Sequence, residues 1–142
     1  VHQLAQRVIN IYSAEPDTRL TLQVMSFGFK NGVPIDADLV FDVRFLPNPH
    51  WVPELRPQTG LSQAVSGYVL AQPGAPEWLD LIESLLVTME PGYLREHKRQ
   101  ATVAVGCTGG KHRSTAMAEA LAKRLRGKDL NVTVLHRDLG RE

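Results

Sequence analysis

The second half of the chain alternates strand-like and helix-like segments, and this alternation restricts the possible folds most strongly. Residues 101–106 (ATVAVG) form a short, apolar, β-rich run, which indicates a buried strand. Residues 112–127 hold Ala, Leu, Glu, Lys and Arg throughout and end at a glycine, which predicts a helix. Residues 131–138 (NVTVLHRD) predict the last strand. A strand, a helix and a strand in this order favour a parallel sheet with a right-handed crossover.

The first half of the chain supplies further segments of both kinds. Residues 20–29 alternate apolar and polar side chains and predict a strand, and residues 37–46 predict a second one. Residues 47–62 contain four prolines and predict a long ordered loop, a kind of segment that tends to be functional. We therefore expect an α/β fold, a single domain with a mostly parallel sheet and flanking helices. The helices are expected at residues 1–13, 61–72 and 76–100, with the last one broken or kinked at Pro91.

Composition limits the class of protein. With 142 residues, 43% apolar and 22% charged, the chain suits one soluble domain, and we expect that domain to span residues 1–142. No apolar run approaches the roughly 20 residues of a membrane span, so no membrane partner is expected. The single cysteine excludes an internal disulfide, no Cys/His cluster suits zinc, and a cytoplasmic location is the natural expectation. The chain begins at Val1 rather than Met, which suggests a piece of a longer protein.

Charge is unevenly distributed along the chain. Residues 1–94 hold five Arg and Lys against ten Asp and Glu, a net charge of −5. Residues 95–142 hold eleven against five, a net charge of +6. A basic half attracts phosphate groups or nucleic acid, although a solvated helix face accounts for the same charges.

The segment GCTGGKHRS, residues 106–114, joins a predicted strand to a predicted helix. The first N–H groups of a helix lack partners and the helix dipole adds positive charge there, so such a junction attracts anions. Its glycines let the backbone approach a ligand, and its lysine and arginine supply full charges. A turn with incidental charges is the alternative. We predict that this glycine loop binds an anion such as phosphate through Cys107, Thr108, Gly109, Gly110, Lys111, His112, Arg113 and Ser114.

Two catalytic motifs can be compared with this loop. A Walker A loop is excluded, because Val105 stands where its first glycine belongs and His112 where Ser or Thr belongs. The spacing of Cys107, Arg113 and the following serine resembles the Cys-x5-Arg-Ser/Thr loop of protein tyrosine phosphatases, in which the cysteine attacks phosphorus. Glu54 would then be the candidate general acid. A phosphatase that acts on a phosphate ester is therefore the alternative function, although no catalytic residue is our first expectation.

Two long motifs, GCTGGKHRS and FGFKNGVPIDADLVFDVRFLPNPHW, resemble the RapZ/YvcJ family of bacterial nucleotide-binding and RNase-adapter proteins. The resemblance runs from about Ser26 to Arg137 and is to the C-terminal domain of the family. It implies a fold like part of phosphofructokinase and no cofactor in this domain. ATP or GTP would belong to an N-terminal P-loop domain that this sequence lacks.

What the family resemblance implies is regulation rather than catalysis. Enteric members bind a small regulatory RNA, sense an aminosugar phosphate and form oligomers, so the expected partners are a phosphorylated small molecule, RNA, an RNase and copies of the chain itself. Besides the glycine loop, the matching positions are Arg44, Asn48 and His50. If their strands are neighbours, Arg44 and Arg113 are expected to share one anion. The alternative for the loop PNPHW is a packed segment with Trp51 as its anchor.

The sequence departs from enteric members in the tail, where Asp138 and Glu142 stand in place of a basic sequence, and each lost phosphate contact weakens RNA binding. On the predicted helix, the i, i+3 and i, i+4 spacings place Lys123 with Arg126 on one face and Arg124 with Lys128 on the adjacent one. Three functions follow: a regulatory metabolite-binding domain, a phosphatase, or an oligomerisation module whose loop is only a turn. The candidate RNA-binding residues are Lys111, Arg113, Lys123, Arg124, Arg126 and Lys128.

Overall fold

The computed structural model describes residues 18–141, so the helix expected within residues 1–13 lies outside the described residues. Four strands and three α-helices are found in this part of the chain, with two short 3-10 helices between them. Their order is β1 (Thr21–Gly28), η2 (Phe29–Asn31), β2 (Leu39–Asp42), η3 (Pro49–Trp51), α2 (Gln63–Leu70), α3 (Ala75–Arg95), β3 (Gln100–Cys107), α4 (Arg113–Leu125) and β4 (Asn131–His136).

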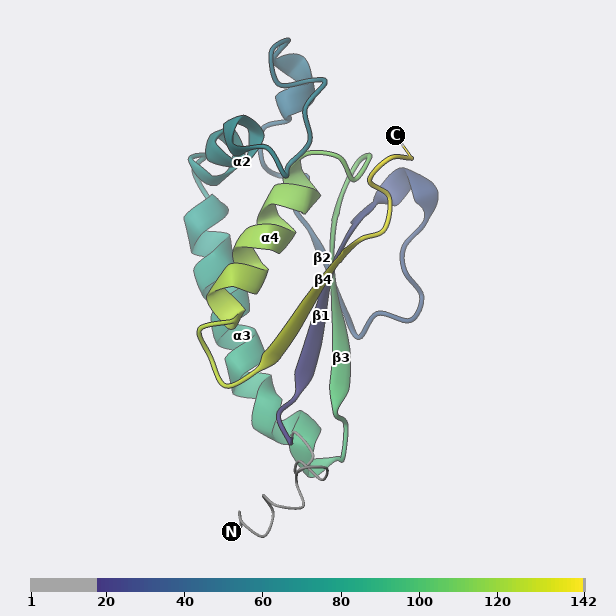
Figure 1. Ribbon diagram of the computed structural model, residues 1–142, viewed down its shortest axis with the longest axis vertical. Helices are drawn as coiled ribbons and strands as arrows, with labels where there is room; N and C mark the ends of the chain where they lie inside the picture. Colours follow the sequence, from purple (N-terminus) through teal and green to yellow (C-terminus); the bar gives the residue numbers. More distant parts are fainter. Residues whose placement is uncertain (1–17, 142) are drawn as a thin grey trace, which may run out of the picture.

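The strands form one sheet in the order β2-β3-β1-β4, and every neighbouring pair is parallel. The helices α2, α3 and α4 lie on the same side of this sheet (Figure 1). The prediction of an α/β fold with a mostly parallel sheet and flanking helices is therefore confirmed. None of the helices in residues 18–141 is long and apolar enough to cross a membrane.

The core lies between the sheet and the helices, with α4 in contact with β1, β3 and β4 and with α2 and α3. Alternate residues of β1, Leu22 and Val24, are buried, as expected for a strand with one face on a core. Met117, Leu121 and Leu125 recur every four residues along α4 and are completely buried. Each such side chain contributes roughly 1.5–3 kcal/mol by leaving water.

Two predicted segments differ from the structure. The strand expected over residues 37–46 covers only Leu39–Asp42, because the Asp42 carboxylate accepts the backbone N–H of Arg44 and turns the chain there. Of the break or kink predicted at Pro91, the break is wrong, since α3 continues through this residue to Arg95. Pro91 is exposed, so water can satisfy the carbonyl group of Val87 that a proline leaves unpaired.

A chain of hydrogen bonds between polar side chains joins the sheet to α4. The hydroxyl of Ser26 on β1 lies 2.6 Å from Nδ1 of His136 on β4, and Nε2 of the same ring lies 2.6 Å from the Glu119 carboxylate on α4. Ser26 is completely buried, so its hydroxyl cannot reach a substrate. These hydrogen bonds therefore hold β1, β4 and α4 together and have a structural role.

Candidate anion-binding site

The candidate site lies at the carboxyl edge of the sheet. Gly28 at the end of β1 is in register with Cys107 at the end of β3, and Asp42 at the end of β2 pairs with Gly106. The segments that follow these three parallel strands therefore meet at one edge, which is where open α/β sheets bind ligands. Arg44 follows β2 and the glycine loop follows β3, and these two strands are neighbours in the sheet.

The glycine loop lies directly on the end of β1. A Cβ atom at Gly28 would overlap the backbone carbonyl of Gly109, and a Cβ atom at Gly110 would lie 2.8 Å from the Gly28 nitrogen. Gly110 also has φ of +83°, a left-handed conformation that favours glycine. The loop and the strand end can approach this closely only because Gly28 and Gly110 lack side chains, whereas a Cβ atom at Gly109 would meet only the Lys30 side chain, at 4.0 Å.

The Asp138 carboxylate binds the backbone at the end of β1. This buried carboxylate accepts the Gly28 N–H at 2.7 Å and pairs with Arg137 at 2.8 Å and Arg141 at 2.9 Å. Burial raises the pKa of Asp138, but the hydrogen bonds from Arg137 and Gly28 and the two positive charges bring that pKa below its ordinary value. In the sequence Asp138 counted only as a negative charge in the tail, whereas the structure makes it a support of the site.

Helix α4 begins at Arg113, immediately after the glycine loop, as the sequence predicts. The residue before it, His112, makes no side-chain capping hydrogen bond, so its side chain leaves the first N–H groups of the helix uncapped. Beneath this helix start, the Cys107 thiol donates a hydrogen bond to the Ser114 hydroxyl at 3.1 Å, and both side chains are buried.

A pocket of about 560 Å³ opens between the glycine loop and the segment after β2. Four cationic side chains line it, and no aspartate or glutamate does. Lys30 and Lys111 take part in no ion pair within residues 18–141, so their charges are available to a ligand. The lining residues are Lys30, Asn48, His50, Trp51, Arg56, Cys107, Thr108, Gly109, Lys111, His112 and Arg113.

Lys30 and Arg56 were not among the predicted ligand residues. Lys30 lies in η2 just after β1, and its backbone N–H donates to the Thr108 carbonyl at 3.2 Å. Arg56 lies in the proline-rich loop, and its Nε donates to the His50 carbonyl at 2.7 Å. The only sequence signal for either residue was a positive charge beside a turn or within a long loop.

Arg113 lines the pocket, but most of its hydrogen-bonding capacity serves the protein. One terminal nitrogen donates to the carbonyl groups of Arg44 at 3.0 Å and Leu46 at 2.9 Å, and the other donates to the Thr108 hydroxyl at 3.3 Å. These bonds occupy three of the five donors of a guanidinium. Arg113, which is 5% exposed, therefore ties the segment after β2 to the glycine loop.

The structure does not support an anion shared by Arg44 and Arg113. The Arg44 guanidinium forms a two-pronged ion pair with Asp42, with a closest distance of 2.7 Å, and lies 3.9 Å from the centre of the Phe29 ring. Arg44 is not among the residues that line the pocket. Gly110 and Ser114, which were also predicted to bind the anion, do not line it either.

The segment PNPHW borders the pocket on the side opposite the glycine loop. The Asn48 side chain accepts the backbone N–H of His50 at 3.0 Å and so caps η3. Pro49 and Leu55 are buried and anchor the segment, whereas Trp51 is 74% exposed. The alternative that Trp51 anchors this loop is therefore wrong.

His112 is the buried histidine of the pocket. Its Nε2 lies 3.1 Å from the Arg56 carbonyl, which suits a neutral ring that donates through this nitrogen. Burial lowers the pKa of His112, and the charges of Lys111 and His50 lower it further, against carbonyl contacts that raise it. His112 therefore serves as a neutral hydrogen-bonding group rather than as a cation.

We expect the free energy of unfolding to decrease as pH falls below about 6.5, the ordinary pKa of histidine. The unfolded chain then protonates His112 before the folded protein does, so protons favour unfolding. Urea unfolding at pH 7.5 and pH 5.5 measures this effect, and His112→Gln should make the pH dependence shallower. His50→Gln, which removes an exposed histidine from the same pocket, is the matched control. An equal pH dependence in wild type and His112→Gln would contradict the assignment.

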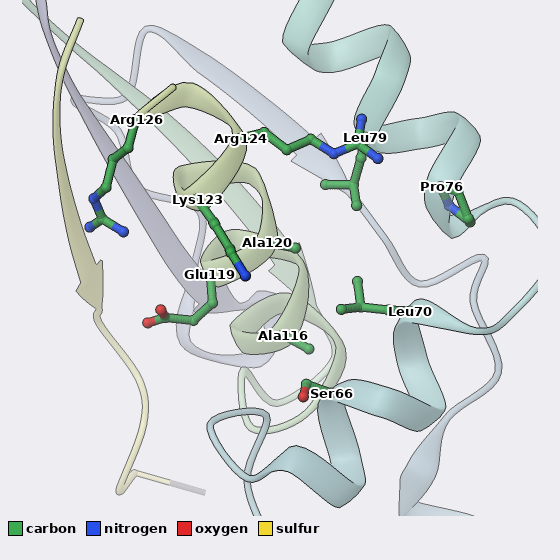
Figure 2. A pocket seen from close by; sticks show the side chains of 10 residues that line it. All are labelled: Ser66, Leu70, Pro76, Leu79, Ala116, Glu119, Ala120, Lys123, Arg124 and Arg126. Atoms are coloured by element: carbon green, nitrogen blue, oxygen red, sulfur yellow. The ribbon is translucent and has the colours of Figure 1, made fainter. Parts of the chain in front are cut away.

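The residues predicted to bind RNA do not form one free basic surface. Arg124 pairs with Asp80 and Glu83 of α3, and Lys128 pairs with Glu83 at 3.1 Å. Figure 2 shows a second pocket, of about 510 Å³, between α2, α3 and α4, where Arg124 reaches toward α3 while Lys123 and Arg126 point in different directions. Acidic side chains of α3 thus compensate two of the four cations beyond the glycine loop.

Comparison with known proteins gives one matching family model and several curated relatives. Residues 20–140 match the family model described as the RapZ C-terminal domain. A nucleotide-binding protein of Cutibacterium acnes is 66% identical over 140 residues, which cover 99% of this chain and 48% of that protein. A nucleotide-binding protein of Streptomyces coelicolor is 58% identical, over 100% of this chain and 48% of its own length. The chain spans about half the length of the curated relatives it matches.

Proposed function

This chain belongs to the family of the RapZ C-terminal domain, and we propose that it is a regulatory domain that binds a small phosphorylated metabolite in the glycine-loop pocket. The proposed ligand class is an aminosugar phosphate or a nucleotide derivative. The relatives are called nucleotide-binding proteins, and their chains are about twice as long as this one. We therefore include in the proposal that this domain controls a nucleotide-binding protein.

The observation that carries the proposal is the charge of the pocket. Lys30, Arg56, Lys111 and Arg113 line it together with the start of α4, and no Asp or Glu is among the lining residues. A dianionic phosphate placed there would meet flexible ammonium groups from Lys30 and Lys111 and N–H groups at the helix start. The same ligand would be repelled from a pocket lined by Asp or Glu.

The geometry favours binding over catalysis by a phosphatase. Cys107 borders the pocket but is only 3% exposed, and its sulfur is hydrogen-bonded to the Ser114 hydroxyl, whereas an attacking cysteine needs access to its substrate. Arg113 gives three of its donors to protein groups, and Glu54 is not among the residues that line the pocket. We therefore expect no phosphate release from p-nitrophenyl phosphate by the wild type or by Cys107→Ser. Release that Cys107→Ser abolishes would favour the phosphatase instead.

Lys111→Met and Lys30→Met are each expected to weaken binding of inorganic phosphate and of glucosamine-6-phosphate about tenfold. The expectation follows from the loss of one charge-assisted hydrogen bond in a partly enclosed pocket. Neither lysine side chain forms an ion pair within residues 18–141, so the melting temperature should stay within about 2 °C of wild type. Isothermal calorimetry and thermal unfolding measure the two quantities.

Lys123→Met is the matched control for these lysine variants. It removes the same charge from α4 at the second pocket and should leave phosphate affinity unchanged. Equal affinities in wild type, Lys30→Met and Lys111→Met would refute the proposed site. An equal decrease in all three variants would point to a general effect of net charge.

RNA binding, an RNase partner and assembly of several copies stay predictions. The ion pairs of Arg124 and Lys128 leave Lys123 and Arg126 as the cations beyond the loop without an acidic partner in the described residues. If the domain binds RNA through this region, Lys123→Met should weaken RNA binding and leave phosphate binding intact. A filter-binding assay at two salt concentrations would measure this difference.

A further inference from the structure

Trp51 is a large apolar side chain in an unusual place. It lines the anion pocket and is 74% exposed. The other tryptophan, Trp78, is only partly exposed and packs edge-on against Phe41, with ring centres 5.9 Å apart. An exposed indole beside a cationic pocket keeps a wide apolar face in contact with water, and that face is available to a ligand.

The backbone holds Trp51 in a defined position. Its N–H donates to the Asn48 carbonyl at 3.1 Å, and the Val52 N–H donates to the Pro49 carbonyl at 2.9 Å. Pro49 is buried, and Arg56 binds the carbonyl of His50 from the following turn. These bonds fix the backbone from which the ring projects, so contact with a ligand would require ordering of the indole side chain but not of the turn.

The pocket is larger than a phosphate group requires. Its volume is about 560 Å³, whereas a water occupies roughly 30 Å³ and phosphate has only five heavy atoms. The cationic groups Lys30 and Lys111 suit the phosphate. The remaining space borders Trp51 and His50, whose rings lie 4.9 Å apart in an edge-to-face arrangement.

We propose that Trp51 is a stacking platform, and that the ligand is a phosphate monoester of a ring compound whose flat face lies on the indole. The phosphate would contact the glycine loop, Lys30 and Lys111, while the ring would lie against Trp51. A sugar offers its C–H face and a nucleoside offers the π face of its base, and both chemistries stack on an indole. This inference rests on the proposed function and adds to it a residue, Trp51, that recognises the ring of the ligand.

The test uses the fluorescence of Trp51 in a Trp78→Phe background, which preserves an aromatic ring beside Phe41. Four probes are titrated: inorganic phosphate, glycerol 3-phosphate, glucosamine-6-phosphate and adenosine monophosphate. At least one ring phosphate should change the fluorescence saturably, with a midpoint that equals the dissociation constant from calorimetry. The tighter of the two ring phosphates identifies the ring as a sugar or a nucleoside.

Substitution of Trp51 separates stacking from phosphate binding. Trp51→Ala should weaken the preferred ring phosphate about tenfold and leave the affinity for inorganic phosphate and glycerol 3-phosphate unchanged. Trp51→Phe, which keeps an aromatic face, should recover most of that loss. Circular dichroism and thermal unfolding should be unchanged, because Trp51 is exposed.

The outcomes distinguish this inference from the proposed function. Unchanged affinity for both ring phosphates in Trp51→Ala would overturn the stacking role while phosphate binding stands. Equal losses for ring and ringless probes would also overturn it, because the indole would then shape the pocket rather than recognise a ring. If none of the four probes binds the wild type, both the inference and the proposed function are wrong.

Discussion

Gly28→Ala is expected to abolish phosphate binding and to lower the free energy of unfolding by about 1–3 kcal/mol. The new methyl group would overlap the backbone carbonyl of Gly109, and backbone atoms cannot rotate away as a flexible side chain can. Either the glycine loop shifts away from the strand end or β1 does. In both cases the N–H groups of the loop and the side chain of Lys111 leave their positions around the pocket.

The measurements for Gly28→Ala are urea unfolding and calorimetry with inorganic phosphate. Gly67→Ala is the control, because a Cβ atom at this helical position would meet no atom within 4 Å. That variant should bind phosphate normally and be slightly more stable, since alanine restricts the unfolded chain and favours the helix. Wild-type phosphate affinity in Gly28→Ala would show that the close contact between strand end and loop is not needed for the site.

Arg113→Ala is expected to lower the free energy of unfolding by about 2–5 kcal/mol, and phosphate binding should be lost with it. The substitution removes the nitrogen that donates to the carbonyl groups of both Arg44 and Leu46. The buried Leu46 carbonyl then loses its hydrogen-bond donor. It also releases Thr108, so the glycine loop loses its tie to the segment after β2. Arg113→Lys keeps the charge but cannot serve three acceptors through a planar fork, so it should restore little of the stability.

Because Arg113 holds the glycine loop in place, a binding experiment on its own cannot show whether Arg113 contacts the ligand. Loss of phosphate binding in Arg113→Ala alone does not identify a ligand contact, because the loop is disturbed at the same time. Urea unfolding must accompany calorimetry, with Arg126→Ala as the control, because Arg126 is exposed and forms no ion pair within the described residues 18–141. If Arg113→Ala unfolds like wild type and loses only phosphate binding, Arg113 is a direct ligand residue and its structural role is minor.

Much of the second half of the fold was predictable because its signals are local. A β-rich apolar run, a glycine loop and an alanine- and leucine-rich segment indicate β3, the loop and α4 from neighbouring residues alone. The boundaries were harder where a single side chain decides them. β2 ends at Asp42 because that carboxylate caps the following turn, and α3 continues through Pro91 because that residue faces water.

The sequence indicated where the candidate site lies, but it did not indicate all the residues that line its pocket. The sequence shows that a glycine loop precedes a helix, and this pattern alone predicts an anion site. It does not show that Lys30, Arg56 and Trp51 border the same pocket, since they lie about 50 to 80 positions before the loop. It also does not show that Arg44 is neutralised by its own neighbour Asp42.

The sequence by itself therefore determined the order of strands and helices, the parallel sheet and the edge at which a ligand would meet the backbone. Periodicity, turn residues and the unpaired N–H groups of a helix start are properties of short segments, so they can be recognised without the fold. Only the tertiary structure decided which charges remain free. Whether a cation meets a carboxylate, as Arg124 meets Glu83, or a ligand pocket, as Lys111 does, depends on elements distant in sequence that packing brings together.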